Sequence, residues 1–361
     1  MANIICFDLE GPLSPQDNAY EVMGLVREGH KLFEVISRYD DILTLEGRMN
    51  YEPGDTLSLI IPFLIHHEIR EGDIRKISDK AKIVDGVDYV IDRLKELDWD
   101  TYIISTSYEQ HALNVARRIG LPREKVYCTR FSLDQYRGEI TEEDVSLIED
   151  VERDILELYP PSDDKEIKNR LDKFFREDLL KTNLGDIMKE VKVVGGQRKV
   201  DALYDIAGKT GKTLGDMIVV GDSITDYKML GEVKSRGGVS IVFNGNEYAL
   251  PHANVGLAST DMRFLLPIIA AYANEGRDGV LDVVKEWEKR HDELMKTPQD
   301  IPKELIPDDV KRFLMEKVCD ESFFKPYFHY LGDVDEGGEK EVLEIHKRAR
   351  SRVRGEAAKL G

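Results

Sequence analysis

The first fifteen residues, MANIICFDLEGPLSP (1–15), decide the fold of this chain. An apolar run (4–7) leads directly into Asp8 and Glu10, and a Gly11-Pro12 turn follows. Short apolar runs bounded by turn residues are typical of central strands in parallel sheets, and ligands bind beyond the carboxyl ends of such strands. Buried acids at a strand end are costly unless a cation or hydrogen bonds satisfy them. The stretch therefore indicates a metal-binding or covalent role, or else a turn whose acids cap the next helix.

Three later stretches add polar residues, two of them at the end of a strand and one at the start of a helix. TYIISTSYEQ (101–110) ends in a cluster of three hydroxyls, and GGQRKVDALYDIAGKTG (195–211) carries Lys199 just inside a helix. MIVVGDSITDYKML (217–230) is a strand that leads into Asp222, with Asp226 four residues further on. Strands that alternate with helices predict an α/β fold with a doubly wound parallel sheet.

This order of acid, hydroxyl, lysine and paired acids resembles the haloacid dehalogenase (HAD) superfamily of phosphohydrolases. The run FDLEGPLS (7–14) matches the first HAD signature, hhhDxDGxx, except that Glu10 stands where a second Asp is usual. Ser105, Lys199 and GDSITD (221–226) match the other three signatures. The resemblance covers roughly residues 3–270 and is greatest to the phosphoserine phosphatase-like branch. The run 7–21 also resembles an archaeal branch, some members of which are labelled subunit R of energy-converting hydrogenase A.

The resemblance implies a role for each matching residue. Asp8 would be the nucleophile that forms an aspartyl-phosphate, and Glu10 the general acid and base. Ser105 and Lys199 would hold the phosphoryl oxygens. Thr106 and Asp17 are candidates for substrate binding, although Asp17 is also well placed to cap a helix.

A magnesium ion is the cofactor that the resemblance implies. An anionic nucleophile that attacks an anionic ester needs a cation between them, and Mg²⁺ takes carboxylate and phosphate oxygens as ligands. The implied ligands are the Asp8 side chain, the main-chain carbonyl of Glu10, and Asp222, with Asp226 in or just outside the coordination sphere.

The chain divides into a core and three additions. We assign residues 1–13, 83–141 and 191–274 to a HAD-like core, and residues 14–82 to an inserted helical cap. Residues 125–141 are expected to hold a short strand pair. The charged segment 142–190 is a second helical insertion, either a further cap element, a partner surface or a solvated hairpin. Residues 275–361 form a helical extension, in which the aromatic run 323–330 is expected to be apolar core.

Charge and composition limit the function classes. The 361 residues include 70 acidic and 51 basic side chains, a net charge of −19, which argues against a general nucleic-acid binder. The basic tail KRARSRVRG (347–355) is interpreted as a solvated helix end or an intramolecular partner for acidic surface. The three cysteines have no metal-ligand spacing and form no disulfide framework. High Lys, Glu and Ile usage favours a thermophilic or archaeal source.

The location and partners follow from the same sequence. No apolar run reaches the length of a membrane span and the N-terminus lacks a signal peptide, so we expect a cytoplasmic protein without membrane insertion. His66 and His67 are adjacent, and neighbouring helix positions point in different directions, so no metal site is expected there.

Two functions of different class remain open. The first is a Mg²⁺-dependent phosphatase that acts on a small phosphorylated metabolite. The second is a HAD-fold accessory or regulatory subunit with little or no turnover, in which the helical additions bind a protein partner or a second copy of the chain.

Overall fold

A mostly parallel sheet forms the centre of the molecule. The computed structural model describes residues 2–136, 138, 140–332 and 336–360, and within them the sheet has the order β3-β2-β1-β4-β5-β6-β7. All neighbouring strands are parallel except β6 and β7. The strands are β1 (Ile4–Phe7), β2 (Asp100–Tyr108), β3 (Val126–Thr129), β4 (Met217–Gly221), β5 (Val239–Phe243), β6 (Val255–Ala258) and β7 (Tyr327–Tyr330).

Helices cover both faces of this sheet, as a doubly wound fold requires. Alternate residues of β1 belong to different apolar clusters, because successive side chains of a strand point to opposite faces. Ile5 and Phe7 pack with α6 (Val87–Glu96), α7 (Glu109–Arg118) and α13 (Leu266–Lys296). Ile4 and Cys6 pack with α11 (Gln197–Thr210) and α12 (Tyr227–Ser235). The predicted doubly wound α/β class with helical additions is confirmed.

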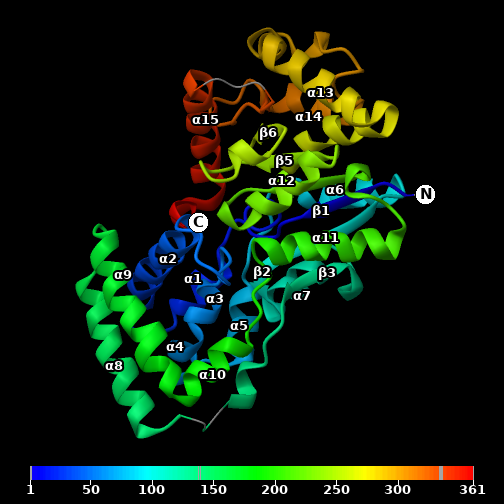
Figure 1. Ribbon diagram of the computed structural model, residues 1–361. Coiled ribbons are helices and arrows are strands. Elements are labelled where there is room, and N and C mark those ends of the chain that lie inside the picture. The colour runs from blue at the N-terminus through cyan, green and yellow to red at the C-terminus, as the bar shows by residue number, and fades with distance from the viewer. Residues whose placement is uncertain (1, 137, 139, 333–335, 361) are drawn as a thin grey trace.

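The two insertions pack together into one helical layer beyond the carboxyl edge of β1 (Figure 1). Tyr39 stacks on Phe175 with ring centroids 5.8 Å apart, and its hydroxyl donates to Asp172 at 2.6 Å. Arg38 forms two hydrogen bonds with Asp164. Residues 142–190 are thus packed on residues 14–82 rather than isolated in solvent. The helices of this layer are α1 (Asn18–Met23), α2 (Gly29–Leu45), α3 (Thr56–Leu59), α4 (Ile61–His66), α5 (Glu71–Ser78), α8 (Glu142–Glu157), α9 (Asp164–Lys173) and α10 (Asn183–Glu190).

The C-terminal extension adds a strand to the sheet as well as helices. Part of the aromatic run forms β7, which pairs antiparallel with β6, so the expectation of an all-helical extension was wrong at this point. Phe328 of β7 packs on Trp287 of α13 with ring centroids 4.8 Å apart. The division placed at residue 274 falls inside α13. After α14 (Asp308–Lys317) and β7, helix α15 (Glu336–Arg354) brings the C-terminus beside α2 (Figure 1).

The strand pair expected in residues 125–141 is found only in part. Strand β3 is present, but the described residues after it form a 3₁₀ turn at Leu133–Tyr136, while residues 137 and 139 lie outside the described part of the chain. Among the described helices, none is both long and apolar enough for a membrane span.

Candidate active site

A buried lysine joins two carboxylates at the carboxyl edge of the sheet. Lys199 Nζ lies 2.8 Å from Asp8 Oδ1 and 2.7 Å from Asp226 Oδ1, and all three side chains are buried. Asp8 directly follows β1, and strand alternation places it on the same face as Cys6, where α11 packs. Gly196 immediately precedes α11 and has φ of 49°, which aims the first turn and Lys199 at this edge.

Asp222 enters the same cluster from the end of β4. Asp226 Oδ2 accepts hydrogen bonds from the main-chain N–H groups of Asp222 (2.9 Å) and Ser223 (3.2 Å), which makes the GDSITD turn compact. Gly11 has φ of 102°, and a Cβ there would lie 2.3 Å from Asp222 Oδ2. Glycine is therefore required for the Glu10-Gly11 backbone to pass so close to this carboxylate.

Glu10 is held by groups from two other elements. Its Oε1 accepts from the main-chain N–H of Asn18 at 3.0 Å and from the hydroxyl of Ser107. Asp17 caps α1 by accepting from the N–H of Tyr20 at 2.9 Å. Ser107 was not singled out from the sequence, although it belongs to the hydroxyl cluster at the end of β2.

The two candidate hydroxyl residues lie in different surroundings. Thr106 lines a small cavity of about 60 Å³ together with Asp8, Glu10 and Asp17. Ser105 is fully buried, and its Oγ accepts from the N–H of Ser107 at 3.1 Å. The structure therefore brings Thr106, rather than Ser105, to the cavity that contains Asp8.

This cavity lies where three parts of the chain meet. Its walls come from the core (Asp8), from α2 (Phe33) and from the C-terminal segment (Arg354, Leu360). Asp40 also lines it and is held by Tyr51 and by the N–H of Gly54. The helical layer and the C-terminus thus cover the cluster at the strand ends.

Burial shifts the acid–base properties of the cluster. Burial, and then the charge of Asp226, raise the pKa of Asp8 to about 7 in spite of Lys199. Burial, and then the charge of Asp17, raise the pKa of Glu10 to about 8 against its two hydrogen bonds. Burial acts against the charged form of Lys199, but Asp226 and Asp8 outweigh it and raise the pKa of the ammonium group. Lys199 thus does not fully offset the cost of burying Asp8 beside Asp226.

The acids fit a divalent metal ion. Asp8, Asp222 and Asp226 each have an oxygen within 4.8 Å of the others. Asp222 Oδ1 is buried and has no hydrogen-bond partner among the described residues. Carboxylate oxygens are the ligands that Mg²⁺ prefers, so a hard divalent ion suits this set of donors.

Comparison with known proteins gives a likeness in structure. The chain matches no protein-family model and no curated protein. It is similar to the structure of gene product AF1437 from Archaeoglobus fulgidus, at 28% identity and a TM-score of 0.75, over 100% of this chain and 99% of that one. It is also similar to a phospho-aspartyl intermediate analogue of phosphoserine phosphatase, at 16% identity and a TM-score of 0.48, over 73% of this chain and 97% of that one. A HAD family hydrolase from Salmonella enterica matches at 13% identity and a TM-score of 0.44, over 68% and 64% of the two chains. The likeness to AF1437 spans the whole chain, including the two helical insertions and the C-terminal extension.

Two arginines of α15 reach the cluster although no motif predicted them. Arg350 and Arg354 both donate to Asp222 Oδ2. They belong to the basic tail, for which an intramolecular acidic partner was one interpretation. That partner is a buried carboxylate and not acidic surface, as Asp222 is 1% exposed.

The histidine pair is arranged differently from the expectation. Helix α4 ends at His66, so His67 does not continue it, and the two rings lie 4.6 Å apart. His67 Nε2 is 2.6 Å from Glu152 Oε1 of α8. The argument from helix faces was therefore wrong here, and the observed contact joins the two insertions.

Proposed function

We propose that this protein is a Mg²⁺-dependent phosphohydrolase of the HAD type that acts on a small phosphomonoester. The observation that carries the proposal is the buried cluster of Asp8, Lys199, Asp222 and Asp226 at the carboxyl ends of β1 and β4. Four sequence signatures in HAD order support it. In this proposal the helical layer acts as the cap that covers the reacting group.

Asp8 is the proposed nucleophile. One carboxylate oxygen attacks phosphorus, the bond from phosphorus to the ester oxygen breaks, and an aspartyl-phosphate forms. Lys199 lies within 2.8 Å of Asp8 and offsets negative charge on the carboxylate and on the phosphoryl group. The Thr106 hydroxyl lines the cavity beside Asp8 and is the proposed donor to a phosphoryl oxygen; Ser105, one residue earlier, is the alternative.

Glu10 is the proposed general acid and base. Its raised pKa, about 8, keeps the carboxyl protonated at neutral pH, so a proton is available for the leaving alkoxide. The resulting carboxylate then removes a proton from the water that attacks the aspartyl-phosphate. Phosphate leaves, and Asp8 and the protonated Glu10 are regenerated.

The metal would be held by side chains and by one main-chain group. Asp8 and Asp222, with Asp226 beside them, are the proposed carboxylate ligands, and the main-chain carbonyl of Glu10 is the proposed fourth. When bound, Mg²⁺ would supply positive charge that draws the phosphate to the carboxylate nucleophile. Asp17, at the cavity wall, is proposed to contact a polar group of the substrate in addition to capping α1.

Hydrolysis of a chromogenic phosphate ester, with and without Mg²⁺, tests the proposal. We expect Mg²⁺-dependent turnover that is abolished in Asp8→Asn, since the amide has nearly the same shape but is not nucleophilic. Asp88→Asn, an exposed site on α6, is the matched control. No hydrolysis of any member of a phosphometabolite panel would favour the accessory-subunit alternative.

A further inference from the structure

Two arginines of the C-terminal helix form ion pairs with Asp222. Arg354 Nη1 donates to Asp222 Oδ2 at 2.8 Å, and Arg350 Nη1 donates to the same oxygen and to the main-chain oxygen of Asp222 at 3.3 Å. The side chains of Arg350 and Arg354 are only 2% and 5% exposed. We call these two residues the arginine pair.

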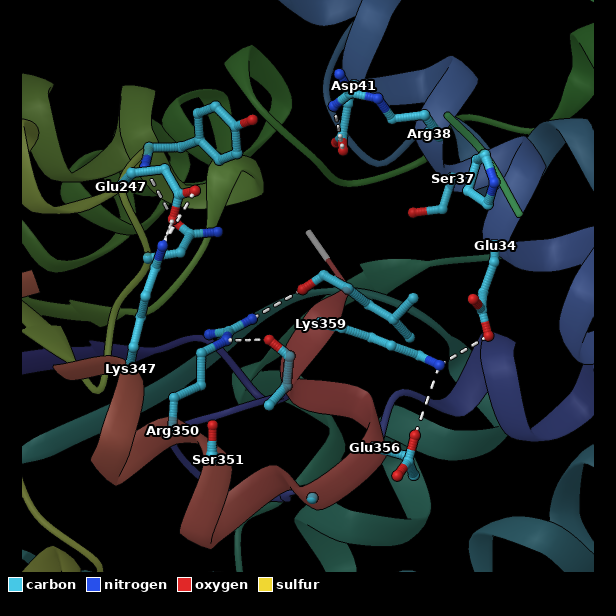
Figure 2. Close-up of a pocket in the computed structure, with 16 residues that line it drawn as sticks. Glu34, Ser37, Arg38, Asp41, Glu247, Lys347, Arg350, Ser351, Glu356 and Lys359 are labelled. Atoms are coloured by element: carbon cyan, nitrogen blue, oxygen red, sulfur yellow. Dashed lines mark hydrogen bonds and ion pairs between the residues drawn. The ribbon is translucent and has the colours of Figure 1, made fainter. Parts of the chain in front are cut away.

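The arginine pair lies within the C-terminal segment (350–360) and binds main-chain carbonyls of that segment and of Pro15. Arg350 Nε donates to the carbonyl of Ala358 at 3.1 Å and Nη2 to that of Leu360 at 2.9 Å (Figure 2). Arg354 Nε donates to the carbonyl of Pro15 at 3.3 Å. The path of the last residues therefore depends on the same guanidinium that contacts Asp222.

The C-terminal segment lines both the inner cavity and an outer cleft. The outer cleft has a volume of about 600 Å³ and lies between α2 and α15 (Figure 2). Leu360 lines both spaces, and Lys359 forms an ion pair with Glu34 of α2 at 2.9 Å. Arg354 lines the inner cavity, whereas Asp222 is covered. The segment thus bridges core and helical layer in front of Asp222.

Cations of the chain itself already lie beside the three carboxylates proposed to hold the ion. Three acids, Asp8, Asp222 and Asp226, face three cations of the chain itself, Lys199 and the arginine pair. A divalent cation that uses Asp222 would share one carboxylate with two guanidinium groups and would be repelled by both.

We propose that the arginine pair competes with a divalent cation for Asp222, so that ion binding and docking of the C-terminal segment oppose each other. The inference rests on the proposed function for the identity of the ion, Mg²⁺. Because coupling between two binding events is reciprocal, removing an arginine tightens ion binding, and the bound ion loosens the C-terminal segment. The extension would then set the Mg²⁺ concentration at which the site is loaded.

Calorimetric titration with Mg²⁺ alone tests the first half of the proposal. Arg354→Gln should bind Mg²⁺ at least about tenfold more tightly than wild type, which corresponds to about 1.4 kcal/mol. Arg354→Lys, which keeps the charge, should remain near wild type. Arg348→Gln, at an exposed position of the same helix, is the control and should not change. Equal or weaker binding by a folded Arg354→Gln overturns the proposal.

Hydrogen exchange of wild type tests the second half without any substitution. Amides of residues 355–360 should exchange faster when Mg²⁺ is saturating, and unchanged or slower exchange overturns the competition. If Mg²⁺ binds and supports hydrolysis but neither readout moves, this inference fails and the proposed function stands. If neither wild type nor Arg354→Gln binds Mg²⁺, both fail.

Discussion

Glu10 is the residue at which the chain departs from the usual signature, and its surroundings explain how a longer acid is accommodated. Asn18 and Ser107 fix one carboxylate oxygen, while Asp17 stands nearby in the cavity wall. The extra methylene changes the reach of the acid and not its chemistry.

Substitutions at Glu10 separate its role in proton transfer from the binding of orthovanadate, a mimic of phosphate. We expect Glu10→Gln to lower single-turnover hydrolysis roughly 10²–10⁴-fold, the usual contribution of a positioned acid and base. Glu10→Asp should stay within about a hundredfold of wild type because a proton donor remains. Orthovanadate binding should change little in either variant. Wild-type rates in Glu10→Gln would make Glu10 structural, and Asp17 the next candidate for the acid.

The neighbouring hydroxyls can be told apart in the same assay. Thr106→Val keeps the shape of the side chain but removes its donor, and we expect a loss of roughly 10²–10³ in kcat, as for other donors to a developing oxyanion. Ser105→Ala removes an acceptor of a local N–H bond, which costs about 1 kcal/mol of stability, and it should leave kcat within about tenfold. A larger loss of kcat in Ser105→Ala than in Thr106→Val would instead make Ser105 the donor to the phosphoryl oxygen.

At the scale of elements, the contact between β7 and α15 includes two buried histidines. His329 Nδ1 lies 3.3 Å from His346 Nε2, and the Tyr327 ring stacks on both His329 and His291. Burial, together with His291, lowers the pKa of His329 to about 4, and burial holds the pKa of His346 well below its usual value. Both rings are therefore neutral in the folded protein at neutral pH.

Acid should weaken this contact. In the unfolded chain the histidine pKa is near 6.5, so as pH falls the unfolded chain takes up protons before the folded one does. The stabilisation that comes from the neutral rings is therefore fully present above about pH 6.5 and is lost as pH drops toward 4. The His329 shift alone corresponds to about 3 kcal/mol. Urea unfolding at pH 7 and at pH 4.5 should show a smaller pH dependence for His329→Gln than for wild type. An identical dependence in both proteins would remove His329 as the cause.

At the scale of the whole molecule, the extension is part of the core rather than an appendage. Strand β7 completes the sheet at β6, Phe328 and Trp287 are buried in the main apolar cluster, and α15 supplies two cations to the site. The helical layer is equally continuous, since both insertions share one apolar cluster.

Truncation tests how far the stability of the fold depends on the C-terminal extension. A chain that ends at residue 325 loses β7 and α15 and exposes the apolar surface around Trp287; truncating one buried aromatic side chain alone costs about 3–5 kcal/mol. We expect the shortened chain to lose its cooperative thermal transition and to bind a hydrophobic dye. A transition within a few degrees of that of the full chain would instead identify an independent appendage.

The sequence by itself determined the parts of this protein that are local or periodic. Apolar runs that end in acids predicted the parallel strands and the doubly wound class. These signals depend only on residues that are close together in the sequence. The resemblance of these stretches to the HAD signatures implied that Asp8, Lys199, Asp222 and Asp226 share one site, and the carboxyl ends of parallel strands lie at one edge of a sheet.

The tertiary structure alone decided the contacts that join distant segments. Strand β7 has four residues in an aromatic run, a pattern that also suits a helix, and only the open edge of β6 makes it a strand. The choice of Thr106 over Ser105 at the cavity depends on which side chain the end of β2 turns toward Asp8. Arg350 and Arg354 lie 128 and 132 positions from Asp222, and no local pattern distinguishes a buried arginine from an exposed one on a basic helix. Their pairing depends on how the extension folds back over the sheet, which is a property of the packed molecule.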